Sequence, residues 1–408
     1  MTTYKTLDDF DLKGKRVLVR ADLDVPMDEN FNITNDIRLR ATLPTVNYLI
    51  SQGAKTILLG HKGRPKGERV FNLSLKPIVK PLAKLLDKDV SYSKNCAGPL
   101  AENDISSMEN GDVLVLENSR FEPGETINSE KLSKEFARLA DIYINDAFAT
   151  SHRTHASTFG IAKFMENKGI GRAFQEEVET LSKIMTSAQK PFLIIIGGAK
   201  ISTKIGVLEN LVPKADQMII GGAMANTFLV AKNYPIGRSL YEPESVDIAR
   251  GVLTTAGVTG CRLQLPHGVT VADELKEFIA TRSVSIEDVK PTDMILDVGQ
   301  RTLDIWQKII DKAGTILWNG PVGAFETEPF DVGSSFIAHA VANSNAFTVI
   351  GGGDTLAAVQ KSGADMTKFN YVSTAGGAML EFLEGSELPA LEALMDSSQD
   401  EENIKETG

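Results

Sequence analysis

In the first half of the chain, side chains that can bind an anion recur where apolar runs of strand length end. Asp22 and Asp24 follow the first run, and Arg38 begins the helical pattern after the next loop. Further cationic and imidazole side chains follow the later runs: His61, Lys62, Arg64, Arg120, His152, Arg153 and His155. Guanidinium groups bind carboxylate and phosphate oxygens in a fork, and ligands of open α/β sheets lie beyond the carboxyl ends of the strands. This half is therefore predicted to bind a small, highly charged anion.

The second half carries glycines rather than cations where its apolar runs end. Its five turns contain Gly197-Gly198, Gly221-Gly222, Gly320, Gly351–Gly353 and Gly376-Gly377. Such a turn lets the backbone approach an anion closely, and it points free N–H groups and a helix N-terminus at that anion. Charged side chains near these turns are few: Lys200, Lys204, Glu326 and Asp354. Glycine turns with a lysine and a carboxylate predict a site for a nucleotide polyphosphate and its magnesium ion.

An anion-binding half and a nucleotide-binding half together indicate phosphoryl transfer, with closure of the two halves during the reaction. The chain has no G-x-x-x-x-G-K-[ST] segment, which excludes a Walker-type kinase. It also has no G-x-G-x-x-G segment, which disfavours a nicotinamide-dependent oxidoreductase. A non-catalytic protein that binds nucleotides or phosphometabolites on the same scaffold stays open as an alternative.

Size and charge limit the remaining possibilities. At 408 residues the chain is too long for one ordinary hydrophobic core, so two or more domains are expected. A net charge of −11 argues against nucleic acid and anionic membrane as partners, and no stretch is apolar enough to span a bilayer. Cys96 and Cys261 lie far apart and form no metal or redox motif, as expected for a cytoplasmic protein.

Apolar runs of strand length alternate with helical patterns throughout, which predicts an α/β fold with mainly parallel sheets. In the first half the predicted strands are 16–20, 56–59, 112–116 and 141–144, and the predicted helices are 38–50, 75–86 and 130–139. Residues 169–188 are predicted to form one helix, because Phe174, Val178, Leu181 and Met185 recur at helical spacing. We expect this helix to connect the two halves.

Eight segments carry a resemblance to a known family. They are Arg16–Pro26, Gly60–Pro65, Leu116–Phe121, Asn145–Ser157, Gly197–Lys204, Gly221–Phe228, Leu317–Gly323 and Gly351–Thr355. Together and in this order they resemble the phosphoglycerate kinase family over nearly the whole chain. The resemblance implies two Rossmann-like domains joined by a connecting helix, and reversible phosphoryl transfer between 1,3-bisphosphoglycerate and ADP that gives 3-phosphoglycerate and Mg-ATP.

The resemblance also implies a domain arrangement. It places a phosphoglycerate-binding domain at 1–169, an interdomain helix at 170–189 and a nucleotide-binding domain at 190–380. Residues 381–408 form a segment that returns to the first domain and ends in an acidic tail. We expect a monomer, because each half can cover its sheet with its own helices.

By the same resemblance, the phosphoglycerate site comprises Asp22, Leu23, Asp24, Arg38, His61, Lys62, Gly63, Arg64, Arg120 and Arg153. The nucleotide site comprises Gly197, Gly198, Lys204, Gly221, Gly222, Asn319, Pro321, Glu326, Gly352, Gly353, Asp354 and Thr355. In that site Asp354 would hold Mg²⁺, and Glu326 would accept from the ribose hydroxyls. Lys200 and Arg38 are expected to stabilise the transferring phosphoryl group, helped by N–H groups of the turn Ala375-Gly376-Gly377.

Six positions depart from what the family usually has: Asp24, Lys62, Gln300, which stands where Gly-Pro is usual, and Ala149, Ala223 and Ala375, which stand where glycine is favoured. Asp24 stands where Asn is usual, and its carboxylate should repel an anionic substrate unless nearby arginines compensate. Lys62 stands where an apolar residue is usual, and it adds positive charge nearby. Ala375 stands where glycine is usual, so a methyl group there could crowd the ligand or restrict the backbone.

Some of these side chains have a simpler structural interpretation. Arg20 is expected to form a structural ion pair rather than a substrate contact. Lys200 and Lys204 are expected to lie one helical turn apart and to face the same crevice. Asp354 could be an ordinary helix N-cap, and Glu326 could cap the helix after Pro329.

Overall fold

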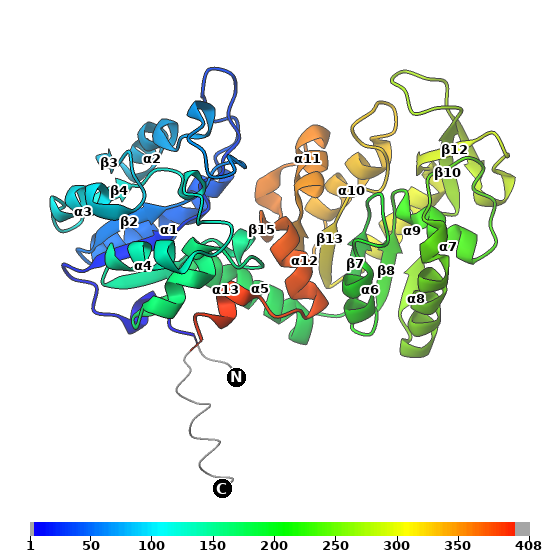
Figure 1. The fold of residues 1–408 in the computed structure, drawn as a ribbon. Coiled ribbons are helices and arrows are strands. Elements are labelled where there is room, and N and C mark those ends of the chain that lie inside the picture. Colours follow the sequence, from blue (N-terminus) through cyan, green and yellow to red (C-terminus); the bar gives the residue numbers. More distant parts are fainter. Residues whose placement is uncertain (1–3, 396–408) are drawn as a thin grey trace, which may run out of the picture. The chain divides into compact units, whose positions relative to one another are not determined.

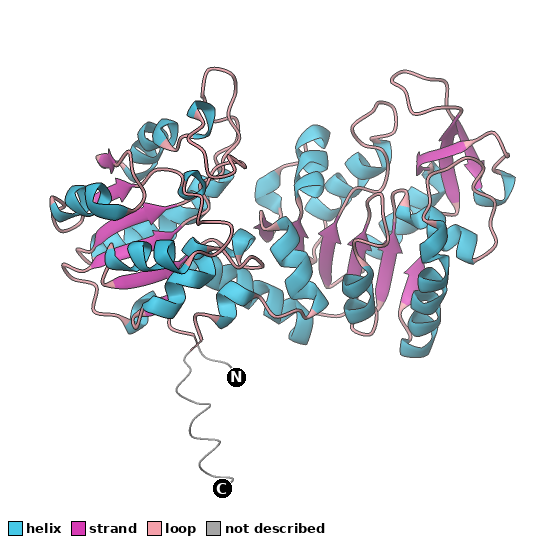
Figure 2. Ribbon diagram, viewed as in Figure 1, coloured by secondary structure: helices cyan, strands magenta, loops and turns pink. Residues whose placement is uncertain are grey.

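The computed structural model describes residues 4–395 of the chain (Figure 1). They form two compact units: unit 1 consists of residues 4–179 together with residues 387–395, and unit 2 consists of Thr180–Ser386. Each unit contains a six-stranded parallel sheet with helices packed against it (Figure 2). The predicted α/β fold with mainly parallel sheets is thus confirmed.

The sheet of unit 1 has the strand order β3-β4-β2-β1-β5-β6. Its strands are β1 (Arg16–Arg20), β2 (Lys55–Leu59), β3 (Val90–Tyr92), β4 (Val113–Val115), β5 (Ile142–Asn145) and β6 (Lys168–Ile170). The strands β1, β2, β4 and β5 lie where the apolar runs predicted them. These central strands are buried on both faces, which explains why they are continuous apolar runs rather than alternating ones.

The helices of unit 1 are α1 (Ile37–Ser51), α2 (Val79–Leu86), α3 (Gly98–Ser106), α4 (Glu130–Arg138) and α13 (Pro389–Glu392). The helix predicted at 75–86 is divided: a 3-10 turn over Lys76–Ile78 precedes α2. The C-terminal segment that contains α13 belongs to this unit, with Leu388 and Leu394 buried. The N–H group of Ala390 donates to the carbonyl oxygen of Ser151 at 3.0 Å.

The helix α5 (Arg172–Ser187) crosses from unit 1 to unit 2, and it is shorter than the predicted helix 169–188. The prediction is wrong at its start, because residues 168–170 form the edge strand β6. The N–H group of Ile170 donates to the carbonyl oxygen of Lys5 at 2.9 Å, so this edge pairs with the N-terminal segment. A Cβ atom at Gly169 would lie 2.5 Å from the same oxygen, which explains the glycine there.

The main sheet of unit 2 has the order β15-β14-β13-β7-β8-β9. Its strands are β7 (Phe192–Ile196), β8 (Gln217–Ile220), β9 (Arg262–Gln264), β13 (Thr315–Asn319), β14 (Phe347–Gly351) and β15 (Tyr371–Ser373). The helices are α6 (Ile205–Leu211), α7 (Met224–Ala231), α8 (Val246–Thr259), α9 (Gln300–Ile310), α10 (Val332–Ala342), α11 (Gly353–Ser362) and α12 (Gly376–Glu384). Trp306 and Trp318 are buried in the core of this unit.

Unit 2 also contains a second, antiparallel sheet that the sequence analysis did not predict. Its strands are β10 (Gly268–Ala272), β11 (Arg282–Ser285) and β12 (Met294–Val298), with β10 in the centre. The edge strand β11 is polar and only partly buried, so it gives no apolar signal. No helix within residues 4–395 combines the length and the apolar character needed to cross a membrane.

Candidate active site

In each unit the strand order reverses at a central strand. In unit 1, β1 pairs with β2 on one side and with β5 on the other. In unit 2, β7 pairs with β8 on one side and with β13 on the other. Ligand crevices of open parallel sheets form beyond the carboxyl ends of the strands at such a reversal. About half of the predicted site residues lie at or after the ends of β1, β5, β7 and β13, and the others follow the neighbouring strands β2, β4, β8, β14 and β15.

Three guanidinium groups of unit 1 surround His61. The pKa of this imidazole is well below its usual value because the ring is buried and because Arg20, Arg120 and Arg153 place positive charge nearby. Burial and then Arg20 and Arg153 lower the pKa of Arg120 to about 10. These cations repel one another in a setting with little water. An anion in the crevice would relieve that repulsion.

Arg20, one of these three cations, is fully buried. Its guanidinium donates to the Ser157 hydroxyl at 3.0 Å, to the Ala21 carbonyl at 2.6 Å and to His61 Nδ1 at 2.8 Å. No carboxylate within residues 4–395 forms a direct ion pair with Arg20, so the predicted structural ion pair is wrong. Its charge is balanced one step away, because the Ser157 hydroxyl donates to Glu125 at 2.5 Å.

His61 has a defined protonation state in this arrangement. Arginine can only donate, so the 2.8 Å contact from Arg20 makes Nδ1 of His61 the acceptor. The proton of the neutral ring is therefore assigned to Nε2, which lies 3.9 Å from Asp24 Oδ2. The Nε2–H group can act as a hydrogen-bond donor to an anion without carrying a charge.

Arg38 and the two carboxylates after β1 lie together. One guanidinium nitrogen of Arg38 is 3.3 Å from Asp22 Oδ1 and 3.0 Å from the carbonyl oxygen of Asp24. The Asp24 carboxylate accepts from the N–H group of Gly63 at 3.2 Å. Burial raises the pKa of Asp22, while Arg38 and Arg20 act against that rise. Arg38 is thus held at the first turn of α1 by oxygen atoms of the loop that it faces.

Lys62 is turned toward the protein backbone. Its buried ammonium group donates to the Val25 carbonyl at 2.8 Å. Burial lowers the pKa of Lys62, and the carboxylate of Asp24 opposes that shift. The two departures from the family pattern therefore lie in each other's electrostatic field, and Lys62 offsets part of the charge that Asp24 adds.

The remaining predicted residues of unit 1 differ in exposure. Arg120 donates to the Gly63 carbonyl at 2.6 Å, and Arg153 donates to His152 at 3.1 Å. Arg64 is exposed, and the structure gives it no partner among the described residues. Leu23 is fully buried against Gly60, so only its backbone can face the crevice.

Several buried polar atoms in unit 1 have no hydrogen-bond partner within the described part of the chain. They include Asp22 Oδ2, Arg120 Nε, His152 Nδ1 and His155 Nδ1. Buried polar groups in folded proteins are nearly always paired with protein, water or ligand. Their concentration at one crevice indicates that it is completed by water or by a polar ligand.

In unit 2 the glycine turns pack directly on one another. A Cβ atom at Gly197 would lie 2.0 Å from the carbonyl oxygen of Pro321, and one at Gly222 would lie 2.5 Å from that of Gly198. At Gly221 it would lie 2.6 Å from the Val322 side chain. These glycines are therefore required by the close approach of the turns, whether or not a ligand is present.

The Lys204 ammonium group holds the same turns together. It donates to the Gly197 carbonyl at 2.7 Å, to the Asn319 carbonyl at 3.2 Å and to Asn319 Oδ1 at 2.6 Å. Burial lowers the pKa of Lys204 to about 8, against an opposing effect of Asp354. Lys204 precedes α6 instead of lying inside it, so the expectation that it follows Lys200 by one helical turn is wrong. Lys200 is exposed.

Five of the predicted nucleotide-site residues line one cavity of about 340 Å³: Gly198, Gly222, Pro321, Glu326 and Asp354. Asp354 lies in the first turn of α11, whose N-cap is Gly352, so it is not an ordinary N-cap. Asp331 is the N-cap of α10, so Glu326 does not cap that helix. The Thr355 hydroxyl accepts from the N–H of Gly320 at 2.7 Å, which joins two of the turns.

Two turns remain open to a ligand. A Cβ atom at Gly353 or at Gly376 would meet nothing within 4 Å, and Gly376 has φ +38°. Gly376 and Gly377 begin α12, where N–H groups have no partner within the helix. The N–H of Ala375 is already bound to the Ser373 hydroxyl at 3.2 Å. Ala375 has φ −85°, so its methyl group does not strain this turn.

The sequence analysis missed two buried carboxylates that position the sites. Glu125 accepts from the Ser157 N–H at 3.0 Å and from the Ser119 hydroxyl at 3.2 Å, which fixes the segments beside Arg153 and Arg120. Asp297 lines the unit 2 cavity and accepts from the Gly333 N–H at 2.7 Å. Burial raises the pKa of Asp297 to about 8. An aspartate inside the apolar run Met294–Val298 was the available signal.

Residues 7–386 match the family model described as phosphoglycerate kinase. The chain belongs to the phosphoglycerate kinase family. Two curated relatives with that name, from Herpetosiphon aurantiacus and Roseiflexus sp., are each 46% identical to it over 96% of this chain and 99% of their own length. The predicted resemblance is therefore confirmed, and with it the prediction of a phosphotransferase.

Solved phosphoglycerate kinases share the fold. The structure from Coxiella burnetii has a TM-score of 0.86 and 43% identity, and covers 96% of this chain and 99% of its own. The structure from Pyrococcus horikoshii OT3 has a TM-score of 0.78 and 33% identity, and covers 95% and 98% respectively. Family membership thus identifies the chain as a glycolytic kinase.

Proposed function

We propose that the chain transfers a phosphoryl group reversibly between 1,3-bisphosphoglycerate and ADP, giving 3-phosphoglycerate and Mg-ATP. Unit 1 would bind the phosphoglycerate, and unit 2 would bind the nucleotide. The observation that carries this proposal is the buried cluster of guanidinium groups around His61, with polar atoms beside it that lack protein partners. We further infer that the enzyme acts as a monomer in the cytoplasm.

The proposed reaction needs no general base. The acceptor is a phosphate oxygen of ADP in one direction and a carboxylate in the other, and both are ionised near neutral pH. The protein must instead align the donor and acceptor and balance the charge on the equatorial oxygens. We assign this role to Arg38 in unit 1 and Lys200 in unit 2, with the N–H groups of Gly376 and Gly377.

Because these groups belong to different units, the proposed chemistry requires the units to close on the two substrates. Closure would also exclude water, which would otherwise hydrolyse the acyl phosphate. The N–H of Ala375 does not contribute, since it already binds Ser373. The N–H of Gly376 can contribute, because a Cβ atom at this residue would meet nothing within 4 Å and a ligand can therefore approach it.

The metal would arrive with the nucleotide. Within residues 4–395, no group of three or more His, Cys, Asp or Glu side chains is arranged to hold a metal ion by itself. Mg²⁺ is usually bound by one or two carboxylates together with substrate phosphates, and the exposed carboxylate of Asp354 at the unit 2 cavity fits that pattern. When bound there, Mg²⁺ would neutralise charge on the phosphate oxygens.

A coupled assay tests the proposal. The protein is incubated with Mg-ATP in the presence and absence of 3-phosphoglycerate, and ADP release is followed. We expect release that depends on 3-phosphoglycerate and saturates with it. A protein that binds both ligands but consumes no ATP at saturation would instead be the non-catalytic alternative, and the proposed reaction would be wrong.

A further inference from the structure

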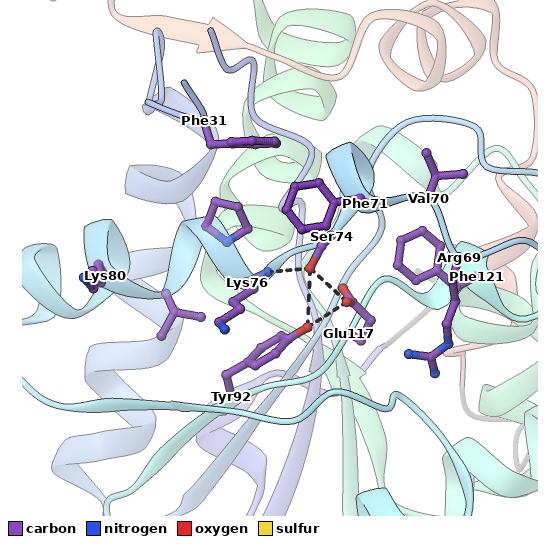
Figure 3. Close-up of a pocket in the computed structure, with 12 residues that line it drawn as sticks. Phe31, Arg69, Val70, Phe71, Ser74, Lys76, Lys80, Tyr92, Glu117 and Phe121 are labelled. Atoms are coloured by element: carbon purple, nitrogen blue, oxygen red, sulfur yellow. Dashed lines mark hydrogen bonds between the residues drawn. The ribbon is translucent and has the colours of Figure 1, made fainter. Parts of the chain in front are cut away.

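Unit 1 contains a second cavity that the proposed reaction does not use. It has a volume of about 680 Å³, within the range of roughly 300–1,000 Å³ that is typical of small-molecule sites. Aromatic rings form much of its wall: Phe31, Phe71, Tyr92 and Phe121 (Figure 3). None of the candidate site residues of unit 1 lines it.

Two phenylalanine rings at this cavity are held apart from the protein core. The rings of Phe31 and Phe71 meet edge to face, with 5.6 Å between their centroids. Phe31 has φ +62°, a backbone conformation that non-glycine residues rarely adopt. Phe71 is 81% exposed, which is unusual for a large apolar side chain beside a cavity. A planar apolar ligand would cover these rings and stack against them.

The buried polar groups in the wall of this cavity already form hydrogen bonds with one another or with the backbone. Glu117 accepts from the Ser74 hydroxyl at 2.9 Å and from the Tyr92 hydroxyl at 2.6 Å (Figure 3). It also accepts from the N–H groups of Leu75 and Asn118. With four donors around it, this buried carboxylate needs no cation from a ligand. The network instead fixes the Tyr92 ring as a rigid part of the wall.

The charge that remains at the cavity is positive. Lys76 and Lys80 line it, both are exposed, and neither ammonium group has a partner among the described residues. Arg69 lines it too, but its guanidinium already binds the Lys94 carbonyl at 2.8 Å and the Asn95 side chain at 3.2 Å. Two free cations beside an aromatic wall are complementary to a ligand with an apolar ring system and one anionic group.

We propose that this cavity binds a planar aromatic monoanion. Its rings would lie among the four aromatic side chains, and its carboxylate or sulfonate would lie beside Lys76 and Lys80. The site would be independent of the phosphoryl-transfer reaction, since it uses different side chains.

The test uses 8-anilinonaphthalene-1-sulfonate as a fluorescent probe of this class, titrated into the full chain. Phe71→Ala and the double variant Lys76→Glu/Lys80→Glu change exposed residues of the cavity. Lys84→Glu is the control, because Lys84 is an exposed lysine of α2, the helix that also carries Lys80, and it does not line the cavity. A probe bound at the unit 2 cavity would be insensitive to all these changes.

We expect saturable binding that Phe71→Ala weakens at least about fivefold and that the double charge reversal weakens about tenfold, with Lys84→Glu unchanged. The uncharged analogue N-phenyl-1-naphthylamine should lose affinity in Phe71→Ala but not in the charge-reversal variant. Circular dichroism checks the folding of each variant. If Phe71→Ala is unfolded, the comparison of Lys76→Glu/Lys80→Glu with the wild type tests the proposal. Equal probe affinity in the wild type and the folded charge-reversal variant would overturn the proposal.

Discussion

At the residue scale, Asp24 and Lys62, both predicted to depart from the family pattern, place opposite charges close together. The Asp24 carboxylate adds negative charge to a crevice that we expect to bind an anion, and Lys62 lies in its field. The sequence revealed both departures, but it could not show that Lys62 is buried with its ammonium bound to the Val25 carbonyl. That contact depends on packing between segments distant in sequence.

Substitution at these two positions should change 3-phosphoglycerate affinity in opposite directions. Asp24→Asn removes a negative charge and keeps an oxygen for the Gly63 N–H, so binding should tighten by about 1 kcal/mol. Lys62→Met removes the offsetting charge and should weaken binding by a similar amount. Calorimetric titration measures both dissociation constants. Weaker binding by Asp24→Asn would show that the carboxylate itself is needed.

Lys200 and Lys204 have different environments, although both were predicted to face one crevice. Lys204→Met would remove the donor to the Gly197 carbonyl and to Asn319 Oδ1, whereas the Asn319 carbonyl would keep the Gly197 N–H at 3.0 Å, so we expect it to lower the unfolding free energy by about 2–4 kcal/mol. Lys200→Met, at an exposed position, should change it by less than about 0.5 kcal/mol. Urea unfolding followed by the fluorescence of Trp306 and Trp318 reports on unit 2 alone. Equal destabilisation by the two variants would contradict the tethering role of Lys204.

His155 makes stability depend on pH. Burial, followed by the charges of Arg120 and Arg20, lowers its pKa to about 4 in the folded protein, whereas an unfolded histidine titrates near 6.5. The unfolded chain therefore takes up this proton first, and stability should fall as the pH drops from 6.5 toward 4. Over this interval the unfolding free energy of His155→Gln should fall by less than that of the wild type, and the difference should reach up to about 3 kcal/mol. Unfolding measured at a series of pH values gives both profiles. Identical pH profiles would exclude this contribution.

At the scale of elements, buried parallel strands were predictable, and strands at the edges were not. The strands β1 and β5 are continuous apolar runs because both their faces are covered, and their ends position the cations of unit 1. The strand β6 is three residues long and contains Gly169; it pairs with β5 on one side, and Thr6 bridges to Ile170 on the other. The polar strand β11 likewise exists through its antiparallel partner β10. Neither carries a local signal strong enough to detect.

The glycine turns were also predictable from the sequence, but the reason for their glycines was only partly predicted. The sequence indicated close approach to an anion, whereas Gly197 is also required by the packing of one turn on another. Gly197→Ala would force a Cβ atom to 2.0 Å from the Pro321 carbonyl, so we expect a loss of more than about 3 kcal/mol or failure of unit 2 to fold. Gly353→Ala is the matched control, because its Cβ atom would meet open space, and its stability should change by less than about 1 kcal/mol. Thermal unfolding of both variants measures this difference. A stable Gly197→Ala protein would mean that the turns do not pack as described.

At the scale of the whole molecule, the chain folds into two compact units, and our proposal assigns one half of a phosphoryl-transfer site to each. Family membership and the fold could be predicted from eight segments in order, because each segment contains the turn that follows a buried strand. The unit to which the C-terminal segment belongs could not be predicted from local pattern, since Leu388 and Leu394 are buried by tertiary packing.

The central claim is that Arg38 of unit 1 and Lys200 of unit 2 act on the same phosphoryl group. Steady-state turnover and ligand affinity, measured on Arg38→Ala and Lys200→Ala, test it most directly. We expect each variant to lose at least about 100-fold in kcat. Arg38→Ala should bind Mg-ADP, and Lys200→Ala should bind 3-phosphoglycerate, within about twofold of the wild type. Turnover near the wild-type rate in either variant would contradict the account.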